Sequence, residues 1–312
     1  DPHDLDGPRG GRAQPQGAAR LDAAAVRVAA AAWPLEWHAD RDAYAAKLAR
    51  WFDTARADLL VFPEYAGMEA SLVAPPPRDT PGAWIDLAAA SAPWVLGLHV
   101  DLARRHGVHC LVGSLPVASP SGPVNRAYLV SPAGAVLWQD KRIPTPWERT
   151  HTALVPGDPL TVAQTALGRV GVLVCHDAEF PDHARALGCD LLLIPACTDT
   201  DRGAARVRVA ARARALEGTC VAILAQTVGE VPGCCFLDAN SGRAGIYAPP
   251  DAGVPPDGIL AESVPRQPGW VRADIPVDAL ARLREGLGEV AIARDWPRAA
   301  QAQPAPLRRF AM

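Results

Sequence analysis

The chain has 312 residues, of which 49% are hydrophobic and 21% are charged, and its formal net charge is −3. The hydrophobic share excludes an intrinsically disordered chain and allows a sizeable core, in one large domain or two medium ones. The near-neutral charge gives no electrostatic basis for nucleic-acid binding, and the lack of any run of about 18 or more apolar residues predicts no membrane-spanning helix.

Residues 1–24 are rich in Gly, Pro, Asp and Arg, and we predict a disordered N-terminal tail there. Arg27 interrupts the apolar stretch that follows, which is therefore interpreted as a buried first strand over 26–32 rather than a signal peptide. Apolar spacing and turn residues predict the rest of the first half. In order, these elements are a helix over 40–57, a strand over 58–62, a helix over 81–106, a strand over 108–113, and a hairpin of strands over 125–131 and 135–140.

The second half continues this alternation of strands and helices. We predict strands over 160–165 and 169–174, a helix over 180–187, a strand over 190–194, a helix over 202–217, a strand over 220–226, loops with short strands over 230–258, strands over 258–264 and 269–274, and a helix over 277–285. The pattern favours the α/β class, although the hairpins do not fit a simple doubly wound sheet. No GxGxxG or GxxxxGK-S/T pattern indicates a nucleotide site.

Seven cysteines are present, an odd number with no CxxC pair, so zinc-ribbon and thioredoxin-type sites lack their usual spacing. Most of them flank apolar runs and are interpreted as small buried residues of a reducing compartment. We therefore expect a cytoplasmic protein. The adjacent Cys234 and Cys235 are interpreted as free thiols rather than a strained disulfide.

Among the 31 lysines and arginines, only Lys47 and Lys141 are lysines. This bias is typical of a GC-rich bacterial genome, so a retained lysine can mark a position that arginine does not suit. Lysine is a compact ammonium with a tunable pKa, whereas arginine is planar and always charged. Lys47 lies on a predicted helix and is interpreted as a chance survival, whereas Lys141 comes directly after a predicted strand.

Three polar residues follow predicted buried strands, namely Glu64, Lys141 and Cys175. Strand ends are where α/β proteins gather their functional groups. Together these side chains suit nucleophilic acyl chemistry, because a thiolate attacks, a carboxylate moves protons and an ammonium holds an oxyanion. We expect the neighbouring cation to lower the pKa of the Cys175 thiol.

These residues lie in three motifs that resemble those of the nitrilase superfamily of carbon–nitrogen hydrolases. The motifs are Phe-Pro-Glu at 62–64, Asp-Lys at 140–141 after a glycine-turn hairpin, and Gly-Val-Leu-Val-Cys-His-Asp at 171–177 with Phe-Pro at 180–181. The resemblance covers residues 26–295 and implies a four-layer α–β–β–α sandwich of mixed α/β (α+β) type. It also implies a Glu64–Lys141–Cys175 triad, with Glu148 orienting Lys141 or Glu64. We accordingly expect a carbon–nitrogen hydrolase domain over 25–295 and a C-terminal extension over 296–312.

The resemblance implies hydrolysis of a small amide through a thioester on Cys175, with no cofactor or metal. Lys141 and the backbone N–H of His176 would hold the oxyanion. Hydrolysis of an N-carbamoyl amine or a nitrile, and acyl transfer to an amine, stay open as alternatives with the same triad. The segment 195–200 and the Arg-rich helix after it resemble a poorly characterised branch, some of whose members are fused to an acetyltransferase domain.

The resemblance also implies a homodimer, or a higher homo-oligomer, built on the helices over 180–187 and 202–217. On the second of these helices, small residues give a surface that allows close approach of a partner helix. These residues are Val207, Ala210, Ala211 and Ala213. The alternative interpretation is a solvated arginine-rich face.

His176 departs from the family pattern, in which an aromatic residue usually follows the nucleophile. Its side chain allows a Cys–His couple, although adjacent residues at a sharp turn point apart. A dense group of metal-ligating residue types allows a metal-dependent hydrolase as a further alternative, but without the paired spacing of zinc sites. This group comprises Cys175, His176, Asp177, Glu179, Asp182 and His183.

Residues next to the motifs are expected to line the substrate pocket. They are Tyr65, Trp147, Glu179, Phe180, Thr198 and Arg202. Arginine binds carboxylates through two parallel hydrogen bonds, so Arg202 or Arg206 is a candidate for binding a substrate carboxylate. The alternative is an exposed arginine on the outer face of the helix.

Overall fold

The computed structural model describes residues 26–290 and 292–299, so the predicted tail over 1–24 lies outside the described residues. The strands are hydrogen-bonded in the order β5-β4-β3-β2-β1-β9-β8-β7-β6, with β13 on β1, β10 and β11 on β9, and β12 on β11. Their bounds are β1 Arg27–Pro34, β2 Leu59–Val61, β3 His109–Val117, β4 Val124–Val130, β5 Val136–Asp140, β6 Val162–Thr165, β7 Gly168–Val172, β8 Leu191–Ala196, β9 Val221–Glu230, β10 Ala239–Ser241, β11 Gly245–Tyr247, β12 Ile259–Glu262 and β13 Gly269–Asp274.

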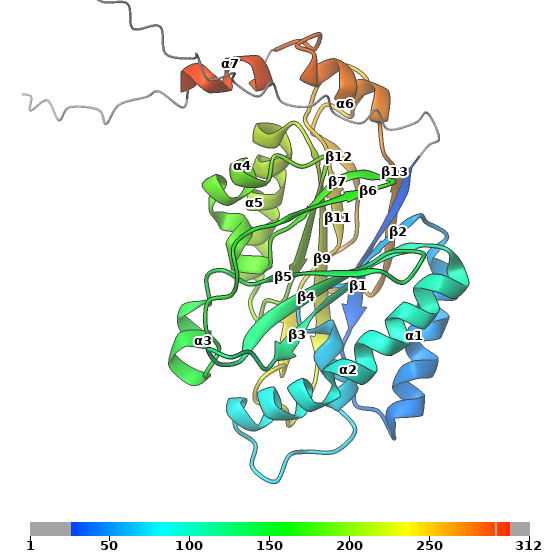
Figure 1. Ribbon diagram of the computed structural model, residues 1–312, viewed down its shortest axis with the longest axis vertical. Helices are drawn as coiled ribbons and strands as arrows, with labels where there is room; N and C mark the ends of the chain where they lie inside the picture. Colours follow the sequence, from blue (N-terminus) through cyan, green and yellow to red (C-terminus); the bar gives the residue numbers. More distant parts are fainter. Residues whose placement is uncertain (1–25, 291, 300–312) are drawn as a thin grey trace, which may run out of the picture.

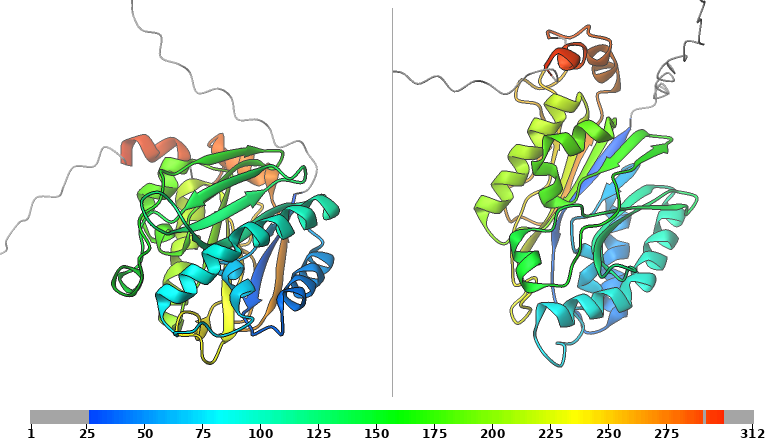
Figure 2. Two further views of the ribbon diagram at one scale, coloured as in Figure 1. Left: turned by 60° about the horizontal axis from the view of Figure 1, so that its bottom comes forward. Right: turned by 60° about the vertical axis from the view of Figure 1, so that its left-hand side comes forward.

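The helices lie mainly on two opposite sides of these strands, with α1 and α2 on one side and α4 and α5 on the other (Figure 1, Figure 2). Their bounds are α1 Arg41–Ala55, α2 Pro81–His106, α3 Pro146–His151, α4 Pro181–Leu187, α5 Asp201–Gly218, α6 Val277–Arg284 and α7 Ile292–Ala299, with short 3₁₀ helices η1 Ala66–Ser71 and η2 Cys175–Glu179.

Alternate residues of the central strand β1 face two different cores. Val28 and Ala30 pack in the core that holds β7, β8 and β9, whereas Ala29 and Trp33 pack in the core beneath α1 and α2. A strand buried on both faces needs apolar residues at every position, which explains the unbroken apolar run of β1. The layers therefore follow the expected order α–β–β–α.

Most predicted elements are present, and the helix predicted over 81–106 matches α2. The Thr80 side chain accepts a hydrogen bond from the Ala83 N–H at its start, and Gly107 ends it in a left-handed conformation with φ of 66°. The short elements α3, η1 and η2 were not predicted, because their few residues carry little apolar periodicity. Helix α7 spans the expected domain end at residue 295, and residues 300–312 lie outside the described residues.

Within the described residues, α2 has the length and apolarity to cross a membrane, with a mean hydropathy of 1.2 over its most apolar window. A core helix of a globular domain meets the same criterion, so this is weak support for a membrane span. Helix α2 packs on β3 and η1, and Trp84, Val95 and Leu102 are buried there.

Two interpretations of single residues are wrong. Val207 and Ala211 of α5 are buried against the sheet inside this chain, so they offer no surface to a partner helix. The interpretation of Lys47 as a lysine retained by chance is also wrong, because the residue is buried, with only 3% of its surface exposed. Its Nζ lies 2.6 Å from Oε1 of the buried Glu69.

Candidate active site

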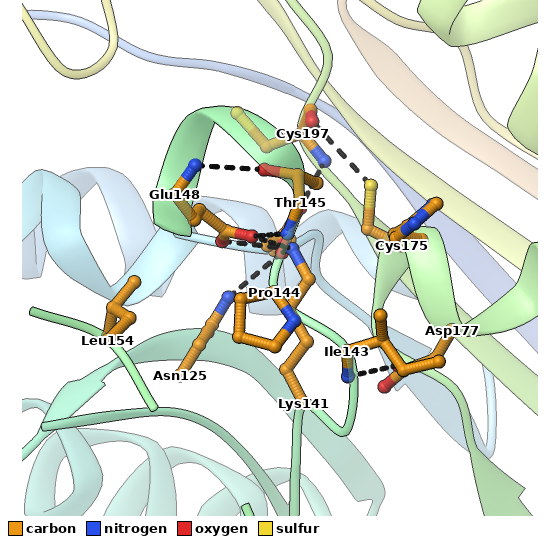
Figure 3. A network of polar contacts seen from close by, with 12 residues as sticks. Asn125, Lys141, Ile143, Pro144, Thr145, Glu148, Leu154, Cys175, Asp177 and Cys197 are labelled. Carbon is orange, nitrogen blue, oxygen red and sulfur yellow. Dashed lines mark hydrogen bonds and ion pairs between the residues drawn. The ribbon is translucent and has the colours of Figure 1, made fainter. Parts of the chain in front are cut away.

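Glu64 follows strand β2 and is 1% exposed, with both carboxylate oxygens engaged. Its Oε1 accepts hydrogen bonds from Lys141 Nζ at 2.8 Å and from Asn125 Nδ2 at 2.9 Å. Its Oε2 accepts a hydrogen bond from the Cys197 N–H at 2.9 Å. Donors near the ends of three separate strands thus hold this carboxylate in one orientation, and Figure 3 shows these donor residues, Asn125, Lys141 and Cys197, around one point.

Lys141 comes directly after strand β5 and is 2% exposed. Its ammonium lies 2.8 Å from Glu64 Oε1 and 2.8 Å from Glu148 Oε2, so one cation serves two buried carboxylates. Its backbone N–H donates to the Asn125 carbonyl at 2.8 Å, which continues the pairing of β4 with β5 past the end of the strand. The lysine is therefore held at both ends.

Glu148 lies on α3, a helix that begins with a capping box. The Thr145 side chain accepts from the Glu148 N–H, and the Glu148 side chain accepts from the Thr145 N–H. The Tyr65 hydroxyl donates a hydrogen bond to Glu148 as well. The structure thus places Glu148 against Lys141, the position expected for the residue that orients it.

Cys175 begins η2, separated by two residues from the end of strand β7, and has a positive φ of 50°. A non-glycine residue in this region costs of order 1–3 kcal/mol and persists only where its surroundings fix it. The Sγ lies 3.7 Å from the Cys197 carbonyl oxygen, and the thiol is buried beside the other two triad residues. The sharp turn places the sulfur at the end of the sheet next to Glu64.

The pKa values within this cluster depend on burial as much as on charge. Burial and the Glu64 charge raise the pKa of the Cys175 thiol well above its usual value, and Lys141 opposes this only in part. The Lys141 charge does act to lower this pKa, but burial and the Glu64 charge outweigh it, so our expectation of a pKa below the usual value is wrong. Burial also raises the pKa of Glu64. Burial alone would lower the pKa of Lys141, but the charges of Glu148 and Glu64 hold it well above its usual value.

The side chain of His176 contacts Glu179 and Phe180. Its Nδ1 lies 3.5 Å from Glu179 Oε1, and its ring meets the Phe180 ring edge-on with centroids 5.0 Å apart. Among the described residues it forms no hydrogen bond with Cys175. These contacts do not favour a Cys–His couple.

The residues after Cys175 do not gather around one point. The Asp177 carboxylate accepts the N–H groups of Arg142 and Ile143 at 2.9 Å each, which ties η2 to the loop after Lys141. Among the described residues, the group of ligand-type side chains that does converge is Glu36, His38 and Glu69, beside Lys47 and outside this pocket. Asp177 thus positions the triad through the backbone.

A cavity of about 660 Å³ opens above the triad. Four of the expected pocket residues line it, namely Tyr65, Trp147, Glu179 and Thr198. Phe180 and Arg202 do not. Phe180 caps the start of α4 and packs between two histidine rings. Helix α5 turns Gly203, Arg206 and Val207 toward the cavity, and this helical rotation directs Arg202 outward to solvent.

Two residues that donate hydrogen bonds to Glu64 were not predicted from the sequence. They are Asn125 and Cys197. Asn125 is the second residue of β4, where the pattern showed only a hairpin strand. Cys197 follows β8, the strand parallel to and next to β7. The rule that selected Cys175, a polar residue directly after a buried strand, applies to Cys197 too and would have found it.

Known proteins are similar to this chain in sequence and in fold. The family model described as carbon-nitrogen hydrolase matches residues 23–265. A probable hydrolase, YhcX of Bacillus subtilis (strain 168), is 31% identical over 234 residues, which is 74% of this chain and 45% of YhcX. A deaminated glutathione amidase of Yersinia enterocolitica is 31% identical over 148 residues, 41% of this chain and 50% of that protein. The chain spans about half the length of these curated relatives.

Among solved structures, an amidase variant from Nesterenkonia sp. covers 87% of this chain and 99% of its own, with a TM-score of 0.58 and 25% identity. That structure shows the result of Michael addition of acrylamide at the active-site cysteine of the amidase.

Proposed function

Since the chain belongs to the carbon-nitrogen hydrolase family, we propose that it hydrolyses a small amide through a thioester on Cys175. The observation that carries this proposal is the meeting of Glu64, Lys141 and Cys175 at the base of one cavity, each buried. The amidases among its relatives and structural neighbours support the amide as substrate.

The first half of the reaction forms the thioester. The Cys175 thiol transfers its proton to ionised Glu64 as the sulfur bonds to the carbonyl carbon. The resting thiol is protonated because its pKa is raised, so a base beside it is needed for attack. The tetrahedral intermediate then collapses, the C–N bond breaks, and Glu64 gives the proton to the leaving nitrogen.

The developing oxyanion needs positive charge or hydrogen-bond donors in place before attack. Lys141 supplies a buried ammonium that Glu148 and Glu64 keep protonated. The backbone N–H of His176 is the second donor in this proposal. Removing one such donor typically costs about 3–4 kcal/mol of transition-state stabilisation.

The second half of the reaction releases the acid. A water molecule gives a proton to Glu64 as its oxygen bonds to the thioester carbon. The C–S bond then breaks, and Cys175 regains its proton from Glu64. No cofactor takes part in these steps, and all proton transfers pass through one carboxylate.

Intact-mass spectrometry tests this proposal. The enzyme is mixed with a panel of small amides, and we expect an acyl adduct on Cys175 and release of ammonia or amine. Cys175→Ala should abolish both the adduct and the hydrolysis, whereas Cys110→Ala and Cys220→Ala remove buried core thiols outside the pocket and should retain turnover. Turnover by Cys175→Ala within about tenfold of wild type would end the proposal.

A further inference from the structure

Both lysines of this chain form ion pairs with glutamates of one short segment. Lys141 pairs with Glu64, and Lys47 of α1 pairs with Glu69, five residues further along. Lys47 and Glu69 are 3% and 0% exposed. In a chain that otherwise uses arginine for its basic residues, both lysines thus neutralise buried carboxylates between β2 and the end of η1.

Glu69 is held on all sides. Its Oε1 lies 2.6 Å from Lys47 Nζ and 2.8 Å from His38 Nε2, and its Oε2 accepts a hydrogen bond from the Trp33 indole. Lys47 Nζ also donates to the Pro34 carbonyl and lies 4.5 Å from the centre of the Trp33 ring. Glu69 is thereby fixed to the end of β1 and to α1.

The segment from Glu64 to the end of η1, which Glu69 anchors, has few local interactions that fix its conformation. Helix η1 is a 3₁₀ helix without a side-chain cap, and such short helices have poor hydrogen-bond geometry. Tyr65, between Glu64 and η1, has a positive φ of 60°, a conformation that needs support from its surroundings. The place of this segment therefore depends on tertiary contacts, and Glu69 supplies the charged one.

Tyr65 connects this segment to both ends of the catalytic cluster. It follows Glu64 directly, its N–H donates to Ser114 Oγ at 3.2 Å, and its hydroxyl donates to Glu148. A shift of η1 would therefore move the base Glu64 and the contact that holds Glu148 against Lys141. A displacement of about 1 Å in such a group can cost about a hundredfold in rate.

We propose that the Lys47–Glu69 ion pair is a positioning device that holds the Glu64–Tyr65 segment in its catalytic place. The proposal rests on the proposed function only for one of its two measurements, the rate of amide turnover. A second readout, the rate at which iodoacetamide alkylates Cys175, needs no knowledge of the substrate. It reports whether Glu64 is placed to take the proton of the thiol.

The decisive variants are Lys47→Met and the charge-neutral pair Lys47→Met with Glu69→Gln. The single variant leaves a buried carboxylate without its cation, which costs stability. The double variant removes both charges, and such replacements are often tolerated. The control is Arg50→Met, which removes an exposed cation from the same helix.

Measurements are made well below the melting temperature of each variant. We expect both variants to lose about tenfold in kcat with KM within about threefold, and to alkylate Cys175 at least about fivefold more slowly. The double variant should regain most of the melting temperature without regaining the rate. Arg50→Met should match wild type in all three measurements.

The proposal is overturned if the double variant folds and shows wild-type kcat and alkylation rate, because the pair is then only structural. It is equally overturned if neither variant folds, because positioning is then inseparable from folding. If wild type hydrolyses no amide yet the alkylation rates fall as expected, the proposed function fails and the positioning role stands.

Discussion

Lys141 is the residue on which the charge balance of the site depends. Its ammonium lies 2.8 Å from carboxylate oxygens of both Glu64 and Glu148, and all three residues are at most 3% exposed at the base of the cavity. A guanidinium there would keep the charge but would not fit between the same two carboxylates, because it is longer and planar.

We therefore predict that Lys141→Arg is almost as damaging as Lys141→Ala, with a loss of about a hundredfold in kcat/KM. Steady-state kinetics on an amide that wild type hydrolyses measures this. Arg105→Lys, on the exposed face of α2, is the control for the exchange itself and should be silent. If Lys141→Arg keeps most of the activity, charge alone suffices at this position.

Asn125 donates a hydrogen bond to Glu64, the proposed base, and is expected to lower the pKa of its carboxyl. Its Nδ2 donates to Glu64 Oε1 at 2.9 Å, while its buried Oδ1 has no hydrogen-bond partner among the described residues. A donor to a carboxylate stabilises the ionised form and lowers its pKa. Burial nevertheless keeps the pKa of Glu64 above its ordinary value of 4.5.

The reaction needs ionised Glu64, so activity is lost as the pH falls through this raised pKa. We predict that the acidic limb of kcat/KM lies above pH 4.5 in wild type. In Asn125→Leu, which keeps a branched side chain but removes the donor, the pKa of Glu64 rises further and the acidic limb moves to higher pH. The pH dependence of kcat/KM, measured for wild type and for Asn125→Leu, gives the acidic limb of each enzyme. An acidic limb at the same pH in both contradicts the role given to Asn125.

At the scale of elements, the outer part of the cavity is formed by the end of η2, by α5 and by the loops before α5 and β10. Carboxylates outnumber cations there, with Glu179, Asp199 and Asp238 against Arg206. Arg206 Nε lies 3.9 Å from Glu179 Oε2. Asp199 and Asp238 form no ion pair within the part of the chain that the structure describes.

We predict that neutral and cationic amides are better substrates than anionic ones. Valeramide and δ-aminovaleramide should have higher kcat/KM than glutaric acid monoamide, by severalfold, and added salt should narrow the gap. The double variant Asp199→Asn with Asp238→Asn should also reduce the difference in kcat/KM between these amides. The control Asp86→Asn, on the exposed face of α2, should leave that difference unchanged. A preference for the anionic amide would instead assign Arg206 to a substrate carboxylate.

At the scale of the whole molecule, we propose the outer face of α5 as the surface that a second copy of this chain would contact. Val209 and Leu216 are 64% and 38% exposed, at positions seven residues apart that share one face of the helix. Of the small residues expected to meet a partner helix, Val207, Ala210 and Ala211 are buried within this chain and Ala213 is partly exposed, so the interface proposed here uses the exposed apolar residues of the same helix.

We predict that the protein is a dimer at micromolar concentration and that Val209→Asp weakens it, because a charge would be buried at the interface. Light scattering measures the mass directly. A wild-type mass near 32.9 kDa would show a monomer and contradict the proposal. Val264→Asp, at a valine that is 63% exposed and lies outside α4 and α5, serves as the matched surface control.

The sequence by itself determined the fold family, most elements and which three residues meet at the proposed site, because these depend on local signals. Buried strands ending in Glu64, Lys141 and Cys175 are visible as apolar runs followed by a polar residue. The class of chemistry follows from the residue types and their order. The boundaries of α2 also followed from local signals, namely Thr80 before the helix and Gly107 after it.

Tertiary structure alone decided which neighbours complete the site and which side chains face the cavity. Asn125, Cys197 and Glu64 are far apart in sequence and meet only because parallel and hairpin strands end at one edge. Arg202 and Arg206 look equivalent in the sequence, and only the rotation of α5 on the sheet separates them. Lys47 looks like a surface residue until Glu69 is packed against it, because burial and charge pairing depend on contacts across the fold.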